Sequence, residues 1–123
     1  MQNNKIPATD NKHKTIYHFT KKEQWTKAVN DYKPLFFDKE GFIHCSKKHQ
    51  IVQAANKFAK GQHNLVILCI DTQQVKAPIV YENTEGGQAL FPHIYGTLNV
   101  SAVVRVVPFP VGSNGFFELP PQL

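Results

Sequence analysis

The chain has few of the features that mark a secreted, membrane-spanning or zinc-binding protein. Its 123 residues include only two cysteines, Cys45 and Cys69, whereas small secreted domains usually contain several disulfides. Neither cysteine belongs to a Cys-x-x-Cys pair, which argues against a structural zinc site. The longest apolar runs, such as residues 65–70, are far too short to span a bilayer, and residues 1–14 lack the apolar segment of a secretory signal. We expect a cytoplasmic protein with reduced cysteines, although the sequence leaves a bridge between them open.

Basic charge is unevenly distributed along the chain. The formal net charge is +5, and residues 21–60 contain nine lysines against four acidic residues, whereas residues 61–123 contain Lys76 and Arg105 against four. A positive field of this kind favours an anionic ligand, such as a nucleotide or a phosphate. Arg-Gly repeats and basic runs with interleaved aromatics are absent from the sequence, so nucleic acid is only weakly supported. We expect a small anionic nucleotide as partner, and the oligomeric state stays open.

Hydrophobic periodicity predicts one domain of strands and two main helices. With 41% hydrophobic residues, the chain is long enough for a single core. A capping box at Thr20 predicts a helix to about residue 30, and Ser46 is the expected N-cap of a second helix that ends at Gly61. Strands are expected at residues 15–19, 42–45, 65–70, 78–81, 103–109 and, as an edge strand, about 116–119. This order predicts an α+β domain with its helices grouped on one side of a curved sheet.

The remaining segments are expected to be irregular. Residues 31–41 contain Pro34 and predict a loop, and residues 82–88 contain Gly86-Gly87 and predict a flexible turn. Residues 91–96, with the sequence FPHIYG, are expected to form an irregular loop anchored by aromatic residues. Loops of this kind commonly carry binding groups.

Three histidines, His18, His44 and His93, lie among aromatic and aliphatic neighbours. The first two are followed at the second position by a hydroxyl, Thr20 and Ser46, and a strand would place each pair on one face. This pattern indicates a polar site on an otherwise apolar sheet. For each histidine the alternative is a packed structural role, because a buried imidazole is tolerated once it is hydrogen-bonded. Thr20 serves equally well as a helix cap.

Imidazole side chains could serve here as acids or bases, as zinc ligands, or as hydrogen-bond partners of a sugar or phosphate. His-x-His and His-x-x-x-His pairs are absent from the sequence, so we predict no metal site. The two motifs His18-x-Thr20 and His44-x-Ser46 resemble those of the two-histidine phosphoesterases, which act on cyclic phosphates. They lie only 26 residues apart, closer than the duplicated lobes of that family would place them.

A second resemblance covers most of the chain. Trp25 and the segments 16–20, 41–46, 56–58 and 90–96 resemble, in order and spacing, the bacterial domain-of-unknown-function family 952. The domain of that family is similar to a compact ADP-ribosyltransferase fold, whose split β-sheet binds NAD. The resemblance implies a compact, split, curved and mostly antiparallel sheet. It divides the chain into a disordered polar tail (1–14), a single family domain (15–110) and a C-terminal extension (111–123).

The resemblance also implies a nucleotide site. The expected ligand is NAD, as substrate, or a related ADP-ribose nucleotide, and the expected activity is an ADP-ribosyl or phosphate-related transferase. A two-histidine-type cyclic phosphoesterase and a non-catalytic nucleotide-binding module remain the alternatives. Glu82 is the candidate for stabilising the positive charge of a ribosyl intermediate. The implied catalytic residues are His44, His93 and Glu82, and the implied ligand-binding residues are His18, Thr20, Ser46 and Tyr95.

Overall fold

The computed structural model describes residues 6–7 and 13–123. Its strand pairs are antiparallel, and its helices are short. In chain order the elements are β1 (Ile6–Pro7), β2 (Thr15–Lys21), α1 (Lys22–Thr26), β3 (Asp31–Tyr32), α2 (Phe37–Glu40), β4 (Ile43–His44), α3 (Ile51–Phe58), β5 (Leu65–Asp71), β6 (Ile79–Glu82), β7 (Phe91–Ile94), β8 (Leu98–Asn99) and β9 (Val103–Phe109). The prediction of a small α+β domain with mostly antiparallel sheets is confirmed.

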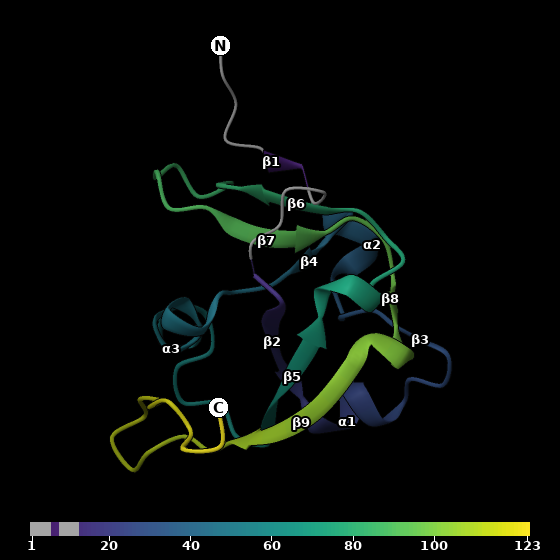
Figure 1. Cartoon of the computed structure of the whole chain (residues 1–123). Helices are drawn as coiled ribbons and strands as arrows, with labels where there is room; N and C mark the ends of the chain where they lie inside the picture. Colours follow the sequence, from purple (N-terminus) through teal and green to yellow (C-terminus); the bar gives the residue numbers. More distant parts are fainter. Residues whose placement is uncertain (1–5, 8–12) are drawn as a thin grey trace.

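The strands form two main sheets that are joined at one point. One sheet has the order β1-β6-β7-β4, the other has the order β2-β5-β9, and β3 and β8 form a separate small ladder (Figure 1). The joint is a bridge between Tyr17 and Ser46, in which each backbone N–H donates to the carbonyl of the other at 2.9 and 2.7 Å. The bridge places the end of β4 beside β2 and so brings His44 close to His18.

Strand β5 is the centre of the fold because both of its faces are buried. Alternate side chains of a strand point to opposite faces. On β5 one set, Leu65, Ile67 and Cys69, packs under α3, and the other set packs between the two sheets. Burial on both faces explains why residues 65–70 are continuously apolar. Cys45 and Cys69 are both buried and free.

The two predicted helix caps are wrong. Thr20 belongs to β2, which continues to Lys21 and pairs there with Leu65, so α1 starts only at Lys22 and lacks a side-chain cap. Ser46 is held in the bridge to Tyr17, and a short 3-10 turn at Lys48–Gln50 precedes α3. In both places backbone pairing with a neighbouring strand replaces the local capping hydrogen bond that the sequence favours.

The structure also corrects three predictions about larger segments. Residues 91–94 form the regular strand β7, paired on both sides with β6 and β4, instead of an irregular loop. The helices lie on different sides, because α3 packs on one face of the β2-β5-β9 sheet whereas Trp25 of α1 packs against the other core. Residues 31–41, predicted as a loop, contain β3 and the single turn α2.

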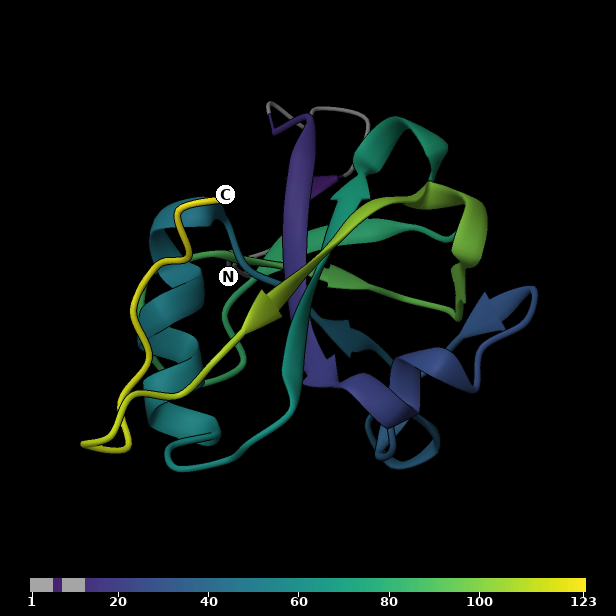
Figure 2. The same ribbon diagram turned by 90° about the horizontal axis from the view of Figure 1, so that it is seen from below.

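The C-terminal segment runs along α3 without forming the predicted strand at 116–119 (Figure 2). Phe117 is buried under α3, and its backbone N–H and carbonyl both bond the side chain of Asn56, at 2.7 and 3.2 Å. Within the predicted N-terminal tail, Ile6–Pro7 pairs with β6, and residues 1–5 and 8–12 lie outside the described residues. Across the part of the chain that the structure describes, none of the helices has the length and apolar character needed to cross a membrane.

Candidate functional site

A cleft of about 930 Å³ opens over the region where β2, β4 and β7 meet. Its floor includes His18, His44, Ser46 and His93. Side chains of α3 form one wall, the loop between β6 and β7 forms a second, and the segment around α2 forms a third. The structure therefore brings the three sequence motifs to one place.

His44 and His93 form a cross-strand pair. They lie directly opposite each other in the β4–β7 ladder, so their side chains leave the sheet on the same face. Their ring centroids are 5.0 Å apart in an edge-to-face arrangement. Phe42 stacks on His93 with centroids 4.4 Å apart and also contacts His44 at 4.7 Å. Two imidazoles at this separation can reach the same small ligand.

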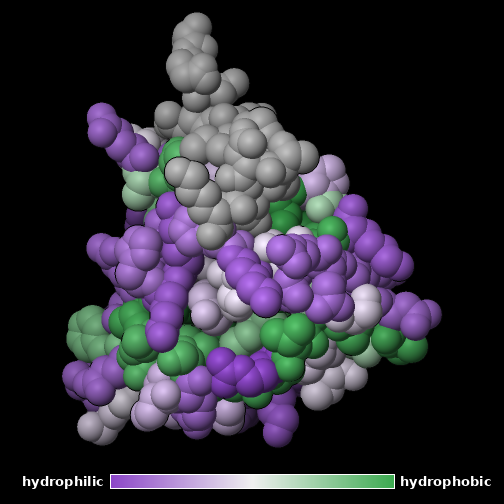
Figure 3. Space-filling model, viewed as in Figure 1, coloured by the Kyte–Doolittle hydropathy of each residue, from purple (hydrophilic) through white to green (hydrophobic). Residues whose placement is uncertain are grey.

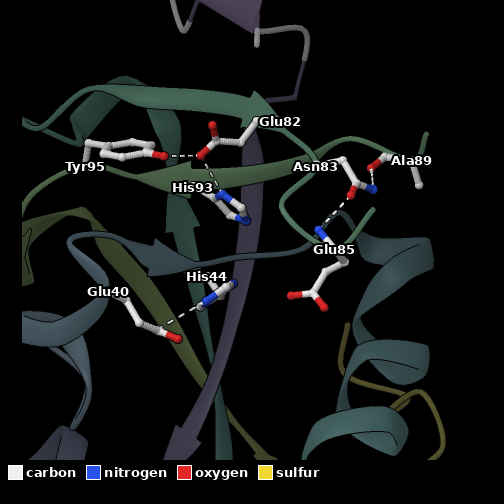
Figure 4. Close-up of polar contacts among 8 residues, drawn as sticks. All are labelled: Glu40, His44, Glu82, Asn83, Glu85, Ala89, His93 and Tyr95. Carbon is white, nitrogen blue, oxygen red and sulfur yellow. Dashed lines mark hydrogen bonds and ion pairs between the residues drawn. The ribbon is translucent and has the colours of Figure 1, made fainter. Parts of the chain in front are cut away.

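Glu82 fixes the orientation of His93. The His93 Nδ1–H donates to Glu82 Oε2 at 2.8 Å, and the Tyr95 hydroxyl donates to the same oxygen (Figure 4). The side chains of His93 and Glu82 are only 3% and 4% exposed. Because Nδ1 carries the hydrogen, Nε2 of the neutral ring is left as an acceptor, and it points away from Glu82 (Figure 4). This is the arrangement in which a carboxylate prepares an imidazole to act as a base.

The electrostatic setting keeps His93 neutral. Burial lowers the pKa of His93 below its ordinary value of 6.5, and the neighbouring His44 lowers it further, although the hydrogen bond to Glu82 opposes both. Burial and the Glu82 carboxylate raise the pKa of Tyr95 to about 12, so the phenol stays protonated and continues to donate. His93 is therefore a neutral base at pH 7.

Glu40 is a part of the site that sequence reasoning missed. Its Oε1 lies 3.3 Å from His44 Nε2, and both side chains are partly exposed on the cleft (Figure 4). Gly41, with φ of +84°, ends α2 and turns the chain back into β4, which brings residue 40 beside residue 44. A spacing of four residues ordinarily indicates a pair on one helix. Because the chain leaves the helix at Gly41, that spacing alone could not have revealed this contact.

His18 is engaged on both ring nitrogens. Nδ1–H donates to the carbonyl of His44 at 2.6 Å, and Nε2 accepts from the Tyr32 hydroxyl at 2.8 Å. The Tyr32 oxygen in turn accepts from Thr20. Burial lowers the pKa of His18 to about 4. His18 and Thr20 thus hold the backbone of His44 in place through hydrogen bonds within the protein.

The predicted residues accordingly fall into two groups. His18, His44, Ser46 and His93 line the cleft, whereas Thr20, Glu82 and Tyr95 do not. Glu82 and Tyr95 lie on the far side of His93 from His44 (Figure 4). Among the described residues, no three His, Cys, Asp or Glu side chains are arranged to hold a metal ion.

Replacing Glu40 by glutamine should lower any activity of the site while leaving the stability of the fold almost unchanged. The Glu40–His44 pair is exposed enough that its loss should alter the free energy of unfolding by at most about 0.5 kcal/mol. Without the carboxylate, His44 loses the partner that orients its ring, so any activity that uses His44 should fall about threefold. The measurement is kcat/KM at pH 7 beside a urea unfolding curve, with Glu23→Gln on α1 as the matched control. An unchanged kcat/KM would show that Glu40 does not act on His44.

Comparison with known proteins places the chain in a family. Residues 19–106 match the family described as "Protein of unknown function (DUF952)". The chain belongs to the DUF952 family. The resemblance to domain-of-unknown-function family 952 is thereby confirmed, and the matched region contains the site residues described above except His18, which directly precedes it.

Solved structures of another protein are similar over most of the chain. A crystal structure of protein CC0527 from Caulobacter crescentus shows 31% sequence identity and a TM-score of 0.76, covering 85% of this chain and 94% of that one. A crystal structure of a double mutant of CC0527 gives the same values. A solution NMR structure of CC0527 shows 30% identity and a TM-score of 0.72, covering 90% and 97%. No curated protein matches this DUF952 chain.

Proposed function

We propose that this DUF952 protein binds NAD or a related ADP-ribose nucleotide in the cleft and acts on it as a transferase, with His44 and His93 as its working pair. The observation that carries the proposal is the geometry of this pair: two imidazoles 5.0 Å apart on one cleft floor, one of them held by a buried carboxylate. Perturbed titratable groups in a cleft mark a candidate site.

The cleft suits a nucleotide in size and chemistry. Its volume of about 930 Å³ lies within the range usual for small-molecule sites. The rings of Phe36, Phe42, Phe58 and Phe91 line it and offer surfaces for a planar base, and Lys57 offers a positive charge for a phosphate. The basic first half of the chain adds a field that attracts anions.

In ADP-ribosyl transfer, the bond between nicotinamide and the ribose C1′ breaks, and its electron pair leaves with the nicotinamide. An acceptor hydroxyl attacks C1′ and gives its proton to Nε2 of His93. His44 donates a hydrogen bond to an oxygen of the ribose or phosphate, and Ser46 lies on the same floor. With no other acceptor bound, water takes this role and the products are ADP-ribose and nicotinamide.

The role that we propose for Glu82 differs from the stabilisation of a ribosyl intermediate that the family resemblance implies. It is buried behind His93, so we assign it to holding the tautomer of His93 and stabilising the imidazolium that forms. Tyr95 supports the same carboxylate. His18 and Thr20 act one step further away, by fixing the backbone of His44.

We extend the proposal to the fold: the two sheets joined at Tyr17 and Ser46 would correspond to the split sheet of the ADP-ribosyltransferases. In support, the cleft lies over the joint between the sheets, and the motif residues His44 and His93 lie on its floor. Fold likeness alone is a weak warrant for an activity. The reaction therefore rests on the histidine pair.

Hydrolysis or transfer of a cyclic phosphate is the second candidate function. The same short distance between His44 and His93 favours it, because one imidazole could act as base and the other as acid on a single phosphate. The pairing of His18 with His44, which the two His-x-Thr/Ser motifs suggest, has less support because both nitrogens of His18 bond protein atoms.

Calorimetric titration with NAD, combined with chromatographic detection of released nicotinamide, tests the proposal. We expect NAD to bind and nicotinamide to be released, and His44→Ala to lose release while remaining folded. A 2′,3′-cyclic nucleotide is assayed in parallel. Cleavage of the cyclic phosphate without any effect of NAD would replace the first function with the second. Binding of NAD with no turnover would leave a non-catalytic nucleotide-binding module.

A further inference from the structure

Two exposed aromatic rings lie at different ends of the cleft. Among the large hydrophobic side chains exposed in the described residues, Phe36 and Phe58 alone line it, and they are 63% and 57% exposed. Phe36 directly precedes α2, whereas Phe58 ends α3, and the two views show these helices apart with β4 between them (Figures 1 and 2). Other exposed hydrophobic side chains, such as Val104 and Val106 on β9, do not line the cleft. Apolar areas are visible on the face of the molecule shown in Figure 3. Large apolar rings left open in a cleft are typical of ligand contacts.

The end at Phe58 also carries a cation. Lys57 Nζ lies 5.2 Å from the centroid of the Phe58 ring and 3.9 Å from Glu85 Oε1. The Lys57 and Glu85 side chains are 62% and 42% exposed, so this ion pair is weak and a phosphate could take the place of the carboxylate. A nucleoside base can stack on the Phe58 ring while its attached phosphate pairs with Lys57 in place of Glu85.

The loop between β6 and β7 holds Glu85 over this end. Asn83 Oδ1 accepts from the backbone N–H groups of Glu85 and Gly87 at 2.8 and 3.0 Å. Asn83 Nδ2 donates to the carbonyl of Ala89 at 2.6 Å, which closes the loop on itself (Figure 4). Glu85 is therefore presented to Lys57 by a structured loop.

The end at Phe36 is the one that carries the reactive groups. The backbone N–H of Glu40 donates to the carbonyl of Phe36 at 3.0 Å, and the Glu40 carboxylate lies 3.3 Å from His44. Phe42, on the same wall, stacks on His93. A ring resting at Phe36 would thus lie on the wall of the cleft that carries Glu40 and Phe42, which contact His44 and His93.

We infer that the ligand is a dinucleotide lying along the cleft, with its adenine on Phe58, its phosphates at Lys57 in place of Glu85, and its reacting nucleoside between Phe36 and the histidine pair. This inference rests on the proposed function and names the residues that select the ligand. Glu85 then competes with the phosphates for Lys57, so its removal strengthens binding.

Calorimetric titration of four variants with separate halves of the ligand tests the inference. The variants are Phe58→Ala, Phe36→Ala, Glu85→Gln and, as matched control, Phe116→Ala, whose ring also lies beside a lysine, with Lys60 Nζ at 4.2 Å from its centroid. The ligands are AMP, nicotinamide mononucleotide, NAD and adenosine. Phe58→Ala should weaken AMP and NAD about tenfold and leave nicotinamide mononucleotide unchanged, since base–aromatic stacking is lost. Phe36→Ala should weaken nicotinamide mononucleotide and NAD and leave AMP unchanged.

Glu85→Gln should tighten AMP and NAD about threefold, as expected for removal of a weak competing ion pair, and leave adenosine unchanged. Phe116→Ala should change nothing. The inference is overturned if Phe58→Ala leaves AMP binding intact, if Glu85→Gln weakens it, or if AMP binds wild type as tightly as NAD and Phe36→Ala has no effect. In each of these cases nucleotide binding itself persists and the proposed function stands. If wild type binds none of the four ligands, the proposed function fails and the inference fails with it.

Discussion

His93→Gln is expected to lower turnover of the bound nucleotide about a thousandfold, the middle of the range for losing a general base. Glutamine is close in size, and its amide can still donate to Glu82, which His93 Nδ1–H now does at 2.8 Å. What it cannot supply is a nitrogen that accepts a proton on the cleft side. Binding of NAD should change little, because the rings and the cation that line the cleft remain.

The measurement is single-turnover nicotinamide release beside calorimetric NAD binding. His49→Gln is the control, since His49 is exposed and lies outside the cleft. Glu82→Gln should give an intermediate loss, because it keeps a partner for Nδ1 but no longer stabilises the imidazolium. Turnover retained in His93→Gln would remove this residue from the chemistry and leave the cleft as a binding site.

The free energy of unfolding should fall by about 3 kcal/mol between pH 7 and pH 4 because of His18 alone. Its pKa is about 4 in the folded protein, against an ordinary value of 6.5. Between these two values the unfolded chain binds a proton that the folded protein does not, so stability is complete above pH 6.5 and is lost as the pH falls toward 4. The lowered pKa of His93 acts in the same direction.

Urea unfolding at a series of pH values measures this effect, with His18→Gln as the comparison. The variant cannot take up the proton, so its stability should depend less steeply on pH between 6.5 and 4, although it is less stable at pH 7. Protonation of carboxylates affects both proteins and cancels in the difference. Equal slopes for wild type and variant would show that burial does not hold His18 neutral in the folded protein.

The strand framework could be predicted from the sequence because its signals are local. The run at residues 65–70 is apolar on both faces, and the structure places it at the centre of the fold. The sequence could not show that Thr20 and Ser46 do not act as helix caps, because both residues pair with strands far along the chain. Thr20 is paired with Val66, and Ser46 is bridged to Tyr17.

The candidate site was predictable in part for the same reason. The motif around each histidine is local, and the β4–β7 register brings His44 and His93 together. Unlike His44 and His93, His18 has both ring nitrogens hydrogen-bonded within the protein. One of these bonds comes from Tyr32, a residue in a segment predicted as a loop. The contact of Glu40 with His44 depends on the turn at Gly41. Neither contact leaves a periodic signal in the sequence.

The most direct test of the central claim is an NMR titration of the histidine side chains with and without NAD. We predict that the NMR signals of His44 and His93 shift together as NAD is added, at concentrations below about 1 mM, the upper end of usual KM values. His49 and His63, which are exposed and lie outside the cleft, should not respond. If the signals of His44 and His93 do not respond to NAD, the two residues do not form one nucleotide site and the proposed function is wrong.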